Sequence, residues 1–274
     1  MTLQFKSLCS GSKGNATLIQ VTCGKGSHAS SHVLVDCGLS LRQMCLRLQQ
    51  AGVQPEQISA IFITHEHADH IGCARAFALR YRTPVWMSQG THAAFKQSDF
   101  DGLLQYASHA QPIAIGALQL RPFAVPHDAR EPLQLCATDG DKTLGIATDL
   151  GHATAQVQAQ LQHCHALVLE ANHDESLLQA SAYPAFLKRR IAGDEGHLSN
   201  AAAAQLAKSI NHARLGHVLA AHLSESNNRP ALAASALAAA GRLRAGSGRH
   251  GGPHHRDGNR RASGLDLKPS KYHY

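Results

Sequence analysis

The sequence predicts an α/β (α+β) protein with four layers in the order αββα, in which helices flank two packed β-sheets. Short apolar strands alternate with helical segments along residues 1–240, and polar residues form clusters just after several of these strands. Layered packing of this kind allows each element to bury one apolar face. We expect the loops that follow the strands to meet at one edge of the sheets, where the polar clusters would come together.

Strands and helices are predicted in order from the spacing of their apolar residues. Segments with alternating or short continuous apolar runs are predicted strands: 3–8, 16–22, 32–36, 60–63, 84–87, 118–125, 133–137, 143–148, 166–170 and 217–221. Segments with apolar residues three and four positions apart are predicted helices: 39–51, 71–81, 90–97, 183–191, 200–212 and 230–240. The first two strands are separated by a glycine-rich turn at 10–15.

The composition changes after residue 240. The chain has 274 residues and is 43% hydrophobic, which is enough for a core, and the periodic pattern indicates one domain over 1–240. From 241 to 274, Gly, Arg and His dominate and the periodicity ends. This pattern predicts a basic tail that is disordered, or one that arises from a shifted reading frame near Ala240.

The net charge of +7 does not by itself indicate a nucleic-acid partner. A basic balance is typical of proteins that bind nucleic acid. However, residues 241–274 contain eight Lys or Arg and two acidic residues, so this tail accounts for +6 and the domain is nearly neutral. We interpret the tail as a solvated terminus.

Several classes of protein are excluded by what the sequence lacks. No apolar run approaches the ~20 residues of a membrane span, and residues 1–6 lack the apolar stretch of a secretory signal. The seven cysteines form no C-x-x-C pair, which argues against a disulfide framework and a cysteine zinc cluster. We predict a cytoplasmic protein that does not bind a membrane and whose cysteines are small buried hydrophobic residues.

A cluster of metal-binding residue types follows the predicted strand 60–63. It contains His65, His67, Asp69 and His70. Side chains alternate along an extended segment, so the first two histidines point to one side, whereas Asp69 and His70 lie where the next helix begins. Two pairs of ligands suit two metal ions about 3.5–4 Å apart, as in two-metal hydrolysis. A solvated turn would not explain why the cluster follows a buried strand.

The run T-H-E-H-A-D-H at 64–70 resembles the signature of the metallo-β-lactamase superfamily. Further segments resemble motifs of that family in the same order: 34–38, 125–128, 147–151 and 221–224. The resemblance extends from residue 3 to about residue 230. It implies the four-layer metallo-β-lactamase fold and a metal-dependent hydrolase.

The resemblance also implies a set of ligands for two divalent metal ions: His65, His67 and His127 for one, Asp69, His70 and His222 for the other, and Asp149 with a water between them. Imidazole and carboxylate ligands suit Zn²⁺ or Mn²⁺. Two such ions lower the pKa of a bridging water and produce a hydroxide nucleophile, so Asp69 belongs to the catalytic group as well. Asp36 is expected to orient a ligand histidine.

Four other segments resemble the YycJ/WalJ branch of the superfamily: 10–16, 170–174, 196–200 and 222–228. This branch is associated with 5′→3′ exonuclease activity on DNA, so the resemblance implies a phosphodiesterase whose substrate is a nucleic acid, with DNA favoured. A hydrolase of a small thioester, cyclic phosphodiester or lactam is the alternative, and a non-catalytic metal-binding module is a third hypothesis. The chain has no large insertion between Asp149 and His222, so substrate binding would depend on core loops or on oligomerisation.

The leaving 3′-oxygen of a phosphodiester needs a proton, which a histidine held by a carboxylate can supply. We predict that His197 and Glu170 form this pair. His173 and Asp174 are the rival pair, because they follow Glu170 on the same loop.

Two short segments are predicted to contact the substrate. The turn at 10–15 is rich in small residues and exposes backbone N–H groups that suit a phosphate. The predicted contacts are Ser12, Lys13 and Asn15 in this turn, and Ser199 and Asn200 after the candidate proton donor. The alternatives are an ordinary β-turn and a helix cap.

Overall fold

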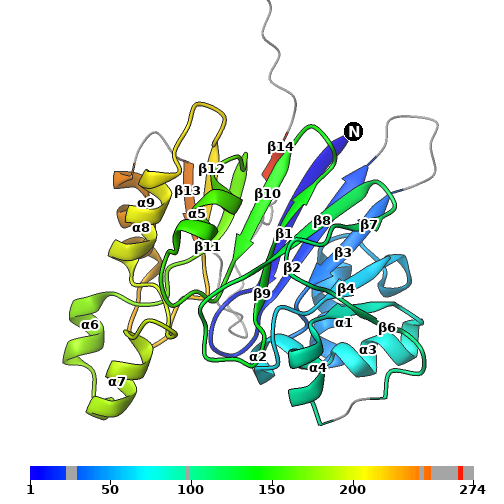
Figure 1. Cartoon of the computed structure of the whole chain (residues 1–274), viewed down its shortest axis with the longest axis horizontal. Helices are drawn as coiled ribbons and strands as arrows, with labels where there is room; N and C mark the ends of the chain where they lie inside the picture. Colours follow the sequence, from blue (N-terminus) through cyan, green and yellow to red (C-terminus); the bar gives the residue numbers. More distant parts are fainter. Residues whose placement is uncertain (23–29, 97–98, 241–243, 248–264, 268–274) are drawn as a thin grey trace, which may run out of the picture.

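The computed structural model describes residues 1–22, 30–96, 99–240, 244–247 and 265–267. Two seven-stranded sheets pack face to face, and helices lie on their outer sides (Figure 1). The predicted four-layer αββα architecture is confirmed. Within the described residues, no helix combines the length and the apolar character needed to cross a membrane.

The first sheet has the strand order β14-β1-β2-β3-β4-β5-β6. Its strands are β1 (Thr2–Cys9), β2 (Ala16–Thr22), β3 (Ser31–Val35), β4 (Ala60–Phe62), β5 (Val85–Met87), β6 (Leu104–Tyr106) and β14 (Leu265–Leu267). Neighbouring strands are antiparallel from β14 to β3 and parallel from β3 to β6. The segments between these strands contain α1 (Leu41–Gln50), the short 3₁₀ helix η1 (Pro55–Gln57), α2 (Ala68–Ile71), α3 (Ala74–Tyr81) and α4 (Gln89–Ala94).

The second sheet has the strand order β13-β12-β11-β10-β9-β8-β7. Its strands are β7 (Ile113–Ile115), β8 (Leu118–Ala124), β9 (Leu133–Thr138), β10 (Thr143–Ala147), β11 (Ala166–Glu170), β12 (His217–Ala221) and β13 (Arg244–Ser247). The strands from β10 to β13 are parallel. The helices of this half are α5 (Ala155–Leu161), α6 (Glu175–Ala180), α7 (Ala185–Ile191), α8 (Asn200–Ser209) and α9 (Pro230–Ala239).

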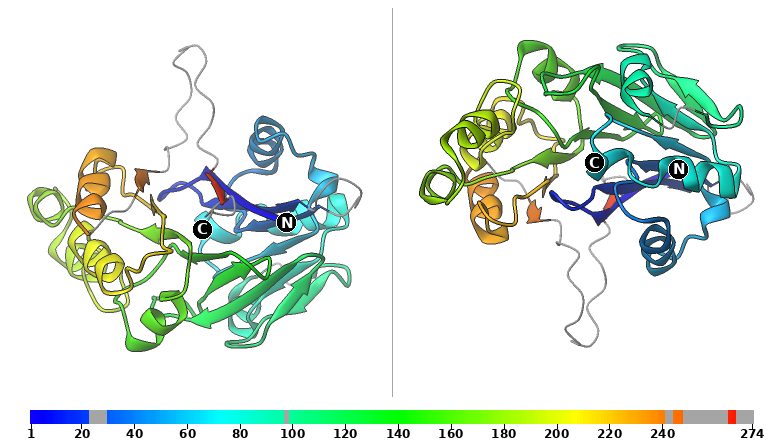
Figure 2. Two further views of the ribbon diagram at one scale, coloured as in Figure 1. Left: turned by 90° about the horizontal axis from the view of Figure 1, so that it is seen from above. Right: turned by 90° about the horizontal axis from the view of Figure 1, so that it is seen from below.

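Three buried apolar clusters hold the layers together. The central one joins the inner faces of the two sheets, and Phe62 and Val168 are examples from each side. The other two lie between a sheet and its helices: α1 and α3 cover the first sheet, and α5, α8 and α9 cover the second. Figure 2 shows these helices on opposite outer sides of the molecule.

The predicted helix at 71–81 is interrupted. α2 ends at Ile71, the next residue Gly72 has a φ of 26° that leaves the helical region, and α3 begins at Ala74. The short strands β6 and β7 and the helices α5 and α6 were not predicted. α5 and α6 begin at the side-chain caps Thr154 and Asp174, but each has only two turns or fewer, so an apolar period is hard to detect.

The C-terminal tail predicted at 241–274 contains two short strands. β13 pairs with β12 in parallel, and β14 pairs with β1 in antiparallel register. The sequence prediction of a tail without regular structure therefore omits these two segments. The rest of the tail, residues 241–243, 248–264 and 268–274, lies outside the described residues, and the hypothesis of a shifted reading frame remains a prediction.

Phe62 provides a test of this packing. Its side chain is fully buried in β4 between the two sheets. We expect Phe62→Ala to lower the free energy of unfolding by about 3–5 kcal/mol, because a large apolar side chain is replaced by a cavity. The matched control is Phe186→Ala, since Phe186 is 66% exposed and a change at such a site is within about 0.5 kcal/mol. Equal urea midpoints for the two variants would contradict the packing described above.

Candidate metal centre and active site

The candidate site residues lie at the carboxyl ends of strands from both sheets. His65 follows β4, Asp149 follows β10, Glu170 ends β11 and His222 follows β12. Since β10, β11 and β12 run parallel, their carboxyl ends meet at one edge, which is the usual place for a ligand site in such sheets. The sequence candidates from distant segments are therefore brought together.

Three histidines form the first group. The potential ligand atoms of His65, His67 and His127 all lie within 4.8 Å of one another. His65 Nε2 lies 3.0 Å from His67 Nδ1. This is the group of three that the sequence suggested for one metal ion.

Asp69, His70 and His222 form the second group, also with ligand atoms within 4.8 Å of one another. Asp69 Oδ2 lies 3.5 Å from His70 Nε2 and 3.4 Å from His222 Nε2. Asp149 contacts both groups: its Oδ1 is 3.7 Å from His127 Nε2, and its Oδ2 is 3.0 Å from His70 Nε2. This is the position that a bridging carboxylate needs.

One buried atom indicates that the residues fit a divalent metal ion. His127 Nε2 is buried and has no hydrogen-bond partner among the described residues. Buried polar atoms are normally hydrogen-bonded, and an ion is one of the few explanations for an exception. Nitrogen and carboxylate oxygen donors together suit borderline or hard divalent cations.

The charges of the cluster also favour a cation. Burial alone would lower the pKa of His222, but the charge of Asp149 and hydrogen bonds with Asp69 and Glu170 outweigh it and raise this pKa to about 10. A field that holds a proton on a buried imidazole also attracts a metal cation. His65 differs, because burial and the neighbouring His70 hold its pKa well below the usual value. His65 is therefore neutral, as metal binding requires.

Asp36 lies behind the ligands, as the sequence suggested. Its Oδ2 is 2.8 Å from His70 Nδ1, which leaves His70 Nε2 facing Asp69 and Asp149. Both the backbone N–H and the hydroxyl of Thr64 donate to Asp36, and the Thr64 hydroxyl lies 2.9 Å from His65 Nδ1. Sequence reasoning assigned no role to Thr64, although it stands next to a ligand histidine.

The backbone of α2 is held by two other loops. Asn15 N–H donates to the Asp69 carbonyl at 2.7 Å, and Cys37 N–H donates to the His70 carbonyl at 2.7 Å. A Cβ atom added to Gly38 would lie only 1.6 Å from the Asp69 carbonyl oxygen. These contacts set the position of both ligands of α2, and they require a residue without a side chain at position 38.

Glu170 joins the metal ligands to the candidate proton donor. It is fully buried, and its Oε1 lies 2.8 Å from His197 Nδ1 and 2.9 Å from His222 Nδ1. Its Oε2 accepts hydrogen bonds from the backbone N–H groups of Leu150 and Leu198. The contact with His222 was not predicted from the sequence. Burial lowers the pKa of His197, but the charge of Glu170 and its hydrogen bond outweigh this effect and raise it.

The rival pair is not assembled in the same way. Asp174 caps α6, where its side chain accepts a hydrogen bond from the Leu177 N–H. His173 is buried, and burial lowers its pKa. Of the two candidates, the structure brings only His197 into contact with Glu170, and the His197 side chain remains 22% exposed.

Two of the predicted substrate contacts, Ser199 and Asn200, form hydrogen bonds inside the protein. Ser199 caps α8 by accepting from the Ala202 N–H, and its hydroxyl donates to Glu175. Asn200 is buried and exchanges hydrogen bonds with Asn228. The helix cap that the sequence offered as the alternative is therefore present at Ser199, and substrate contact by Ser199 and Asn200 stays a prediction.

The three candidates in the first turn fall into two classes. The side chain of Asn15 is buried, and its Nδ2 lies 3.2 Å from Asp69 Oδ2 and 3.0 Å from His70 Nε2, so it positions metal ligands. Ser12 and Lys13 are exposed. Lys13 forms an ion pair with Glu225 at 2.6 Å, with 79% of its side chain exposed.

Asp128 and Arg190 were missed by the sequence reasoning. Asp128 Oδ1 lies 3.5 Å from His127 Nε2 and 4.0 Å from His67 Nε2. Its Oδ2 accepts from Arg190 Nε and Nη2, both at 2.6 Å. The position of Asp128 directly after the candidate ligand His127 was a signal in the sequence, whereas no pattern pointed to its partner Arg190 on α7.

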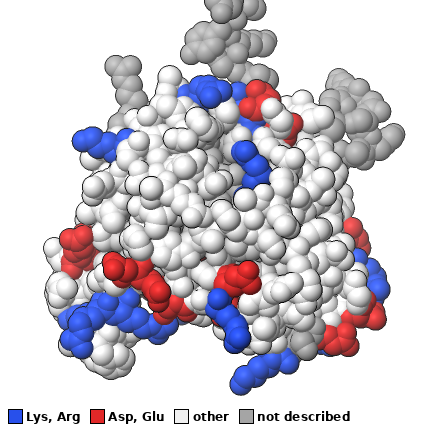
Figure 3. Space-filling view, in the orientation of Figure 1, with Lys and Arg blue, Asp and Glu red and all other residues white. Residues whose placement is uncertain are grey.

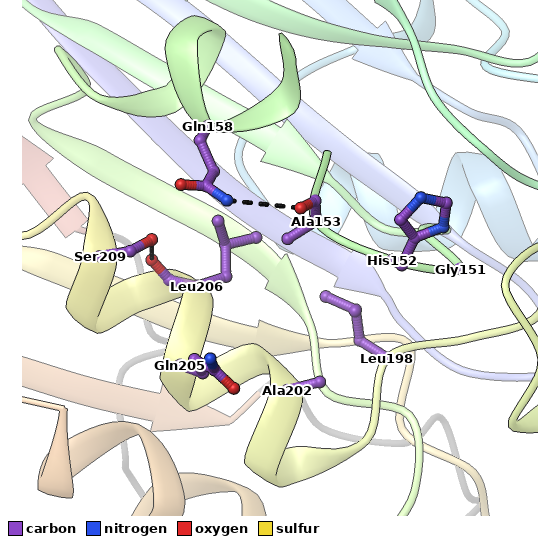
Figure 4. A pocket seen from close by; sticks show the side chains of 9 residues that line it. All are labelled: Gly151, His152, Ala153, Gln158, Leu198, Ala202, Gln205, Leu206 and Ser209. Carbon is purple, nitrogen blue, oxygen red and sulfur yellow. Dashed lines mark hydrogen bonds between the residues drawn. The ribbon is translucent and has the colours of Figure 1, made fainter. Parts of the chain in front are cut away.

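A cavity of about 280 Å³ lies beside the site, between α5 and α8. Figure 4 shows Gly151 and His152, which follow the predicted bridging aspartate, near Leu198, which follows His197. Gln158 Nε2 donates to the Ala153 carbonyl across one side of it. His152 is its only titratable lining residue, so the chemistry described above is located at the metal cluster and not in this cavity.

Comparison with known proteins agrees with the resemblance that the motifs of the sequence indicated. The sequence profile of the Metallo-beta-lactamase superfamily matches residues 10–168. Exodeoxyribonuclease YycJ of Bacillus anthracis is 31% identical over 236 residues, which cover 85% of this chain and 87% of that protein. Exodeoxyribonuclease WalJ of Streptococcus pneumoniae strain D39 is 30% identical over 235 residues, with coverage of 84% and 85%.

Among solved structures, the metallo-beta-lactamase fold protein YhfI of Bacillus subtilis superposes with a TM-score of 0.70. It covers 91% of this chain and 98% of its own at 16% sequence identity. At that identity the likeness shows a shared fold.

The contact at Gly38 leads to a prediction. We expect Gly38→Ala to lose bound metal and to lower thermal stability, because its methyl group would displace the Asp69 carbonyl and with it both ligands of α2. Gly216→Ala is the control, since a Cβ atom there meets nothing within 4 Å. Metal content by elemental analysis and Tm by calorimetry measure the difference. Full metal loading in Gly38→Ala would show that metal binding does not require the close contact between Gly38 and the Asp69 carbonyl.

Proposed function

The chain belongs to the metallo-β-lactamase superfamily, in its YycJ/WalJ-like branch, and on this basis we propose that it is a phosphodiesterase that degrades DNA as a 5′→3′ exonuclease. Members of the superfamily are metallo-hydrolases, and the curated relatives with about a third of their residues in common are named exodeoxyribonucleases. The fold alone does not determine the substrate. The proposal that the substrate is a polynucleotide therefore depends on the residues of the site.

The Glu170–His197 pair is the observation that carries this proposal. Glu170 occupies Nδ1 of His197, so Nε2 is the ring nitrogen that can donate a proton. The pair stands next to Asp149, with His197 Nδ1 3.6 Å from Asp149 Oδ1. A 3′-oxygen is a poor leaving group until it is protonated, and a positioned histidine supplies that proton. A thioester releases a stable thiolate, which does not need such an acid.

The two groups of ligands support two metal ions. We propose that His65, His67 and His127 hold one ion and that Asp69, His70 and His222 hold the other. Asp149 contacts both groups, and Zn²⁺ or Mn²⁺ suits these donors. When bound, such ions lower the pKa of a bound water and offset phosphate charge. The chain itself orients the ligands through Asp36 and Glu170.

The first turn supports a contact with phosphate. Ser12 and Lys13 are exposed on a loop whose neighbour Asn15 reaches the ligands of α2. We propose that Ser12 and Lys13 bind a substrate phosphate. The ion pair of Lys13 with Glu225 is exposed and therefore contributes little stability that would oppose such a contact.

The roles of His67 and His197 can be separated by mutation. We expect His67→Ala to lose metal and turnover together, because a ligand is removed. His197→Ala should keep its metal content and lower kcat by about 10²–10⁴-fold, the usual contribution of a positioned acid. His163→Ala is the control, since this histidine is exposed on the turn after α5. Loss of metal in His197→Ala would show that His197 is a ligand or a structural residue.

The substrate class is tested with the purified protein loaded with Mn²⁺ or Zn²⁺. End-labelled single- and double-stranded DNA and RNA are compared with bis-p-nitrophenyl phosphate. We expect stepwise shortening of DNA from its 5′ end and slower hydrolysis of the small diester. Hydrolysis of the small diester without cleavage of any polynucleotide would reject the exonuclease proposal and favour a small-molecule hydrolase.

A further inference from the structure

Helix α7 buries none of its residues. A surface helix normally buries an apolar stripe against the core. Instead, Phe186 is 66% exposed, and the last turn carries Lys188, Arg189 and Arg190. Figure 1 shows α6 and α7 projecting at the end of the molecule where α2 lies, and Figure 3 shows Lys and Arg side chains over this projection with Asp and Glu side chains beside them. The exposed side chains of α7 are therefore available for a contact outside the chain.

The last turn of α7 is fixed to the wall of the metal centre. The backbone N–H of His197 donates to the Ile191 carbonyl at 2.8 Å. A Cβ atom on Gly196 would lie 2.2 Å from the Arg190 carbonyl, and the Gly196 carbonyl is 3.1 Å from His127 Nδ1. The carboxyl end of the helix is thus held against two residues of the site, and its first turn extends away from them.

One face of α7 combines an aromatic ring with two guanidinium groups. Phe186, Arg189 and Arg190 are spaced i, i+3 and i+4, so they lie on the same face of the helix. Lys188 points elsewhere, since its ammonium group donates to the Gln179 carbonyl of α6. We call the surface of Phe186, Arg189 and Arg190 the α7 face.

Arg190 connects the α7 face to the metal cluster. Its Nε and Nη2 are bound by Asp128, which itself approaches His127. A guanidinium group has five N–H donors, so Nη1 remains available, and the side chain is 62% exposed. Arg189 forms no ion pair within the described part of the chain. Planar guanidinium groups of this kind suit phosphate oxygens.

We infer that the α7 face binds an unpaired segment of polynucleotide next to the scissile phosphate, with one base stacked on Phe186 and phosphates on Arg189 and Arg190. This inference rests on the proposed function. Aromatic side chains stack on any base, and arginines follow the backbone, which is the usual combination for single strands. Asp194 and Glu195 follow on the next loop and limit the positive charge to α7, so the contact spans one or two nucleotides.

Stacking and charge are tested by separate variants of the metal-loaded protein, acting on an end-labelled single-stranded DNA oligonucleotide and on bis-p-nitrophenyl phosphate. We expect Phe186→Leu to raise KM for the oligonucleotide by about tenfold, because Leu keeps apolar area but has no ring to stack. Phe186→Trp keeps a flat ring and should restore KM to within about twofold of the original value. Equal KM values for the Leu and Trp variants would reject the stacking role.

Arg189→Ala should weaken oligonucleotide binding and make the slope of log K against log salt concentration shallower by about 0.7, the amount for one phosphate contact on a single strand. Arg214→Ala is the matched control: this arginine is exposed just before β12, whereas the site lies at the far end of that strand. It should leave the slope unchanged. Equal slopes for the two arginine variants would reject the phosphate contact.

The two substrates separate this inference from the proposed function. We expect the variants of the α7 face to lower the ratio of kcat/KM for the oligonucleotide to kcat/KM for the small diester. If the unaltered protein cleaves the small diester and no oligonucleotide, both the proposed function and this inference fail. If it cleaves oligonucleotides and the ratio is the same in every variant, the assignment of the α7 face alone fails.

Discussion

Two fully buried carboxylates, Asp149 and Glu170, must be compensated by positive charge and hydrogen bonds from the rest of the site. A buried carboxylate is costly unless positive charge and hydrogen bonds compensate it. His222 Nδ1 lies 3.2 Å from Asp149 Oδ1 and 2.9 Å from Glu170 Oε1, and His70 Nε2 lies 3.0 Å from Asp149 Oδ2. The parallel strands β10, β11 and β12 deliver these groups because they end side by side. The buried negative charge explains why a divalent cation fits where the strands end.

The backbone is strained at two of these positions. Asp36 and His222 have φ values of 64° and 53°, in the left-handed region that side-chain-bearing residues seldom adopt. The conformation of His222 is held on both sides, since its N–H donates to Ser10 Oγ and its carbonyl accepts from Asn172 Nδ2. Strain of this kind persists where surrounding contacts fix it, and it is concentrated at functional sites. Here it occurs at one proposed metal ligand, His222, and at Asp36, whose carboxylate contacts another, His70.

The sequence predicted those parts of the site whose residues are close together along the chain. The spacing of His65, His67, Asp69 and His70 after a strand was sufficient, because side-chain direction follows from an extended segment entering a helix. Contacts between distant segments, such as Glu170 with His222 or Asp128 with Arg190, have no local pattern to reveal them. Ser199 was ambiguous for a different reason: a hydroxyl before an alanine-rich helix suits both a cap and a substrate contact, and the structure shows the cap.

Glu170 also holds His222, the proposed metal ligand, and His197, the proposed proton donor, in a fixed relative position. One oxygen of this carboxylate contacts both His222 and His197, and its other oxygen is held by the backbone N–H groups of Leu150 and Leu198. Those two N–H groups follow Asp149 and His197 in the chain, so the carboxylate cannot shift without moving the residues on either side. A shift of His222 is therefore passed to His197 through a single rigid group. The proposed cleavage of a phosphodiester requires this alignment, because the attacking and leaving oxygens lie on opposite sides of one phosphorus atom.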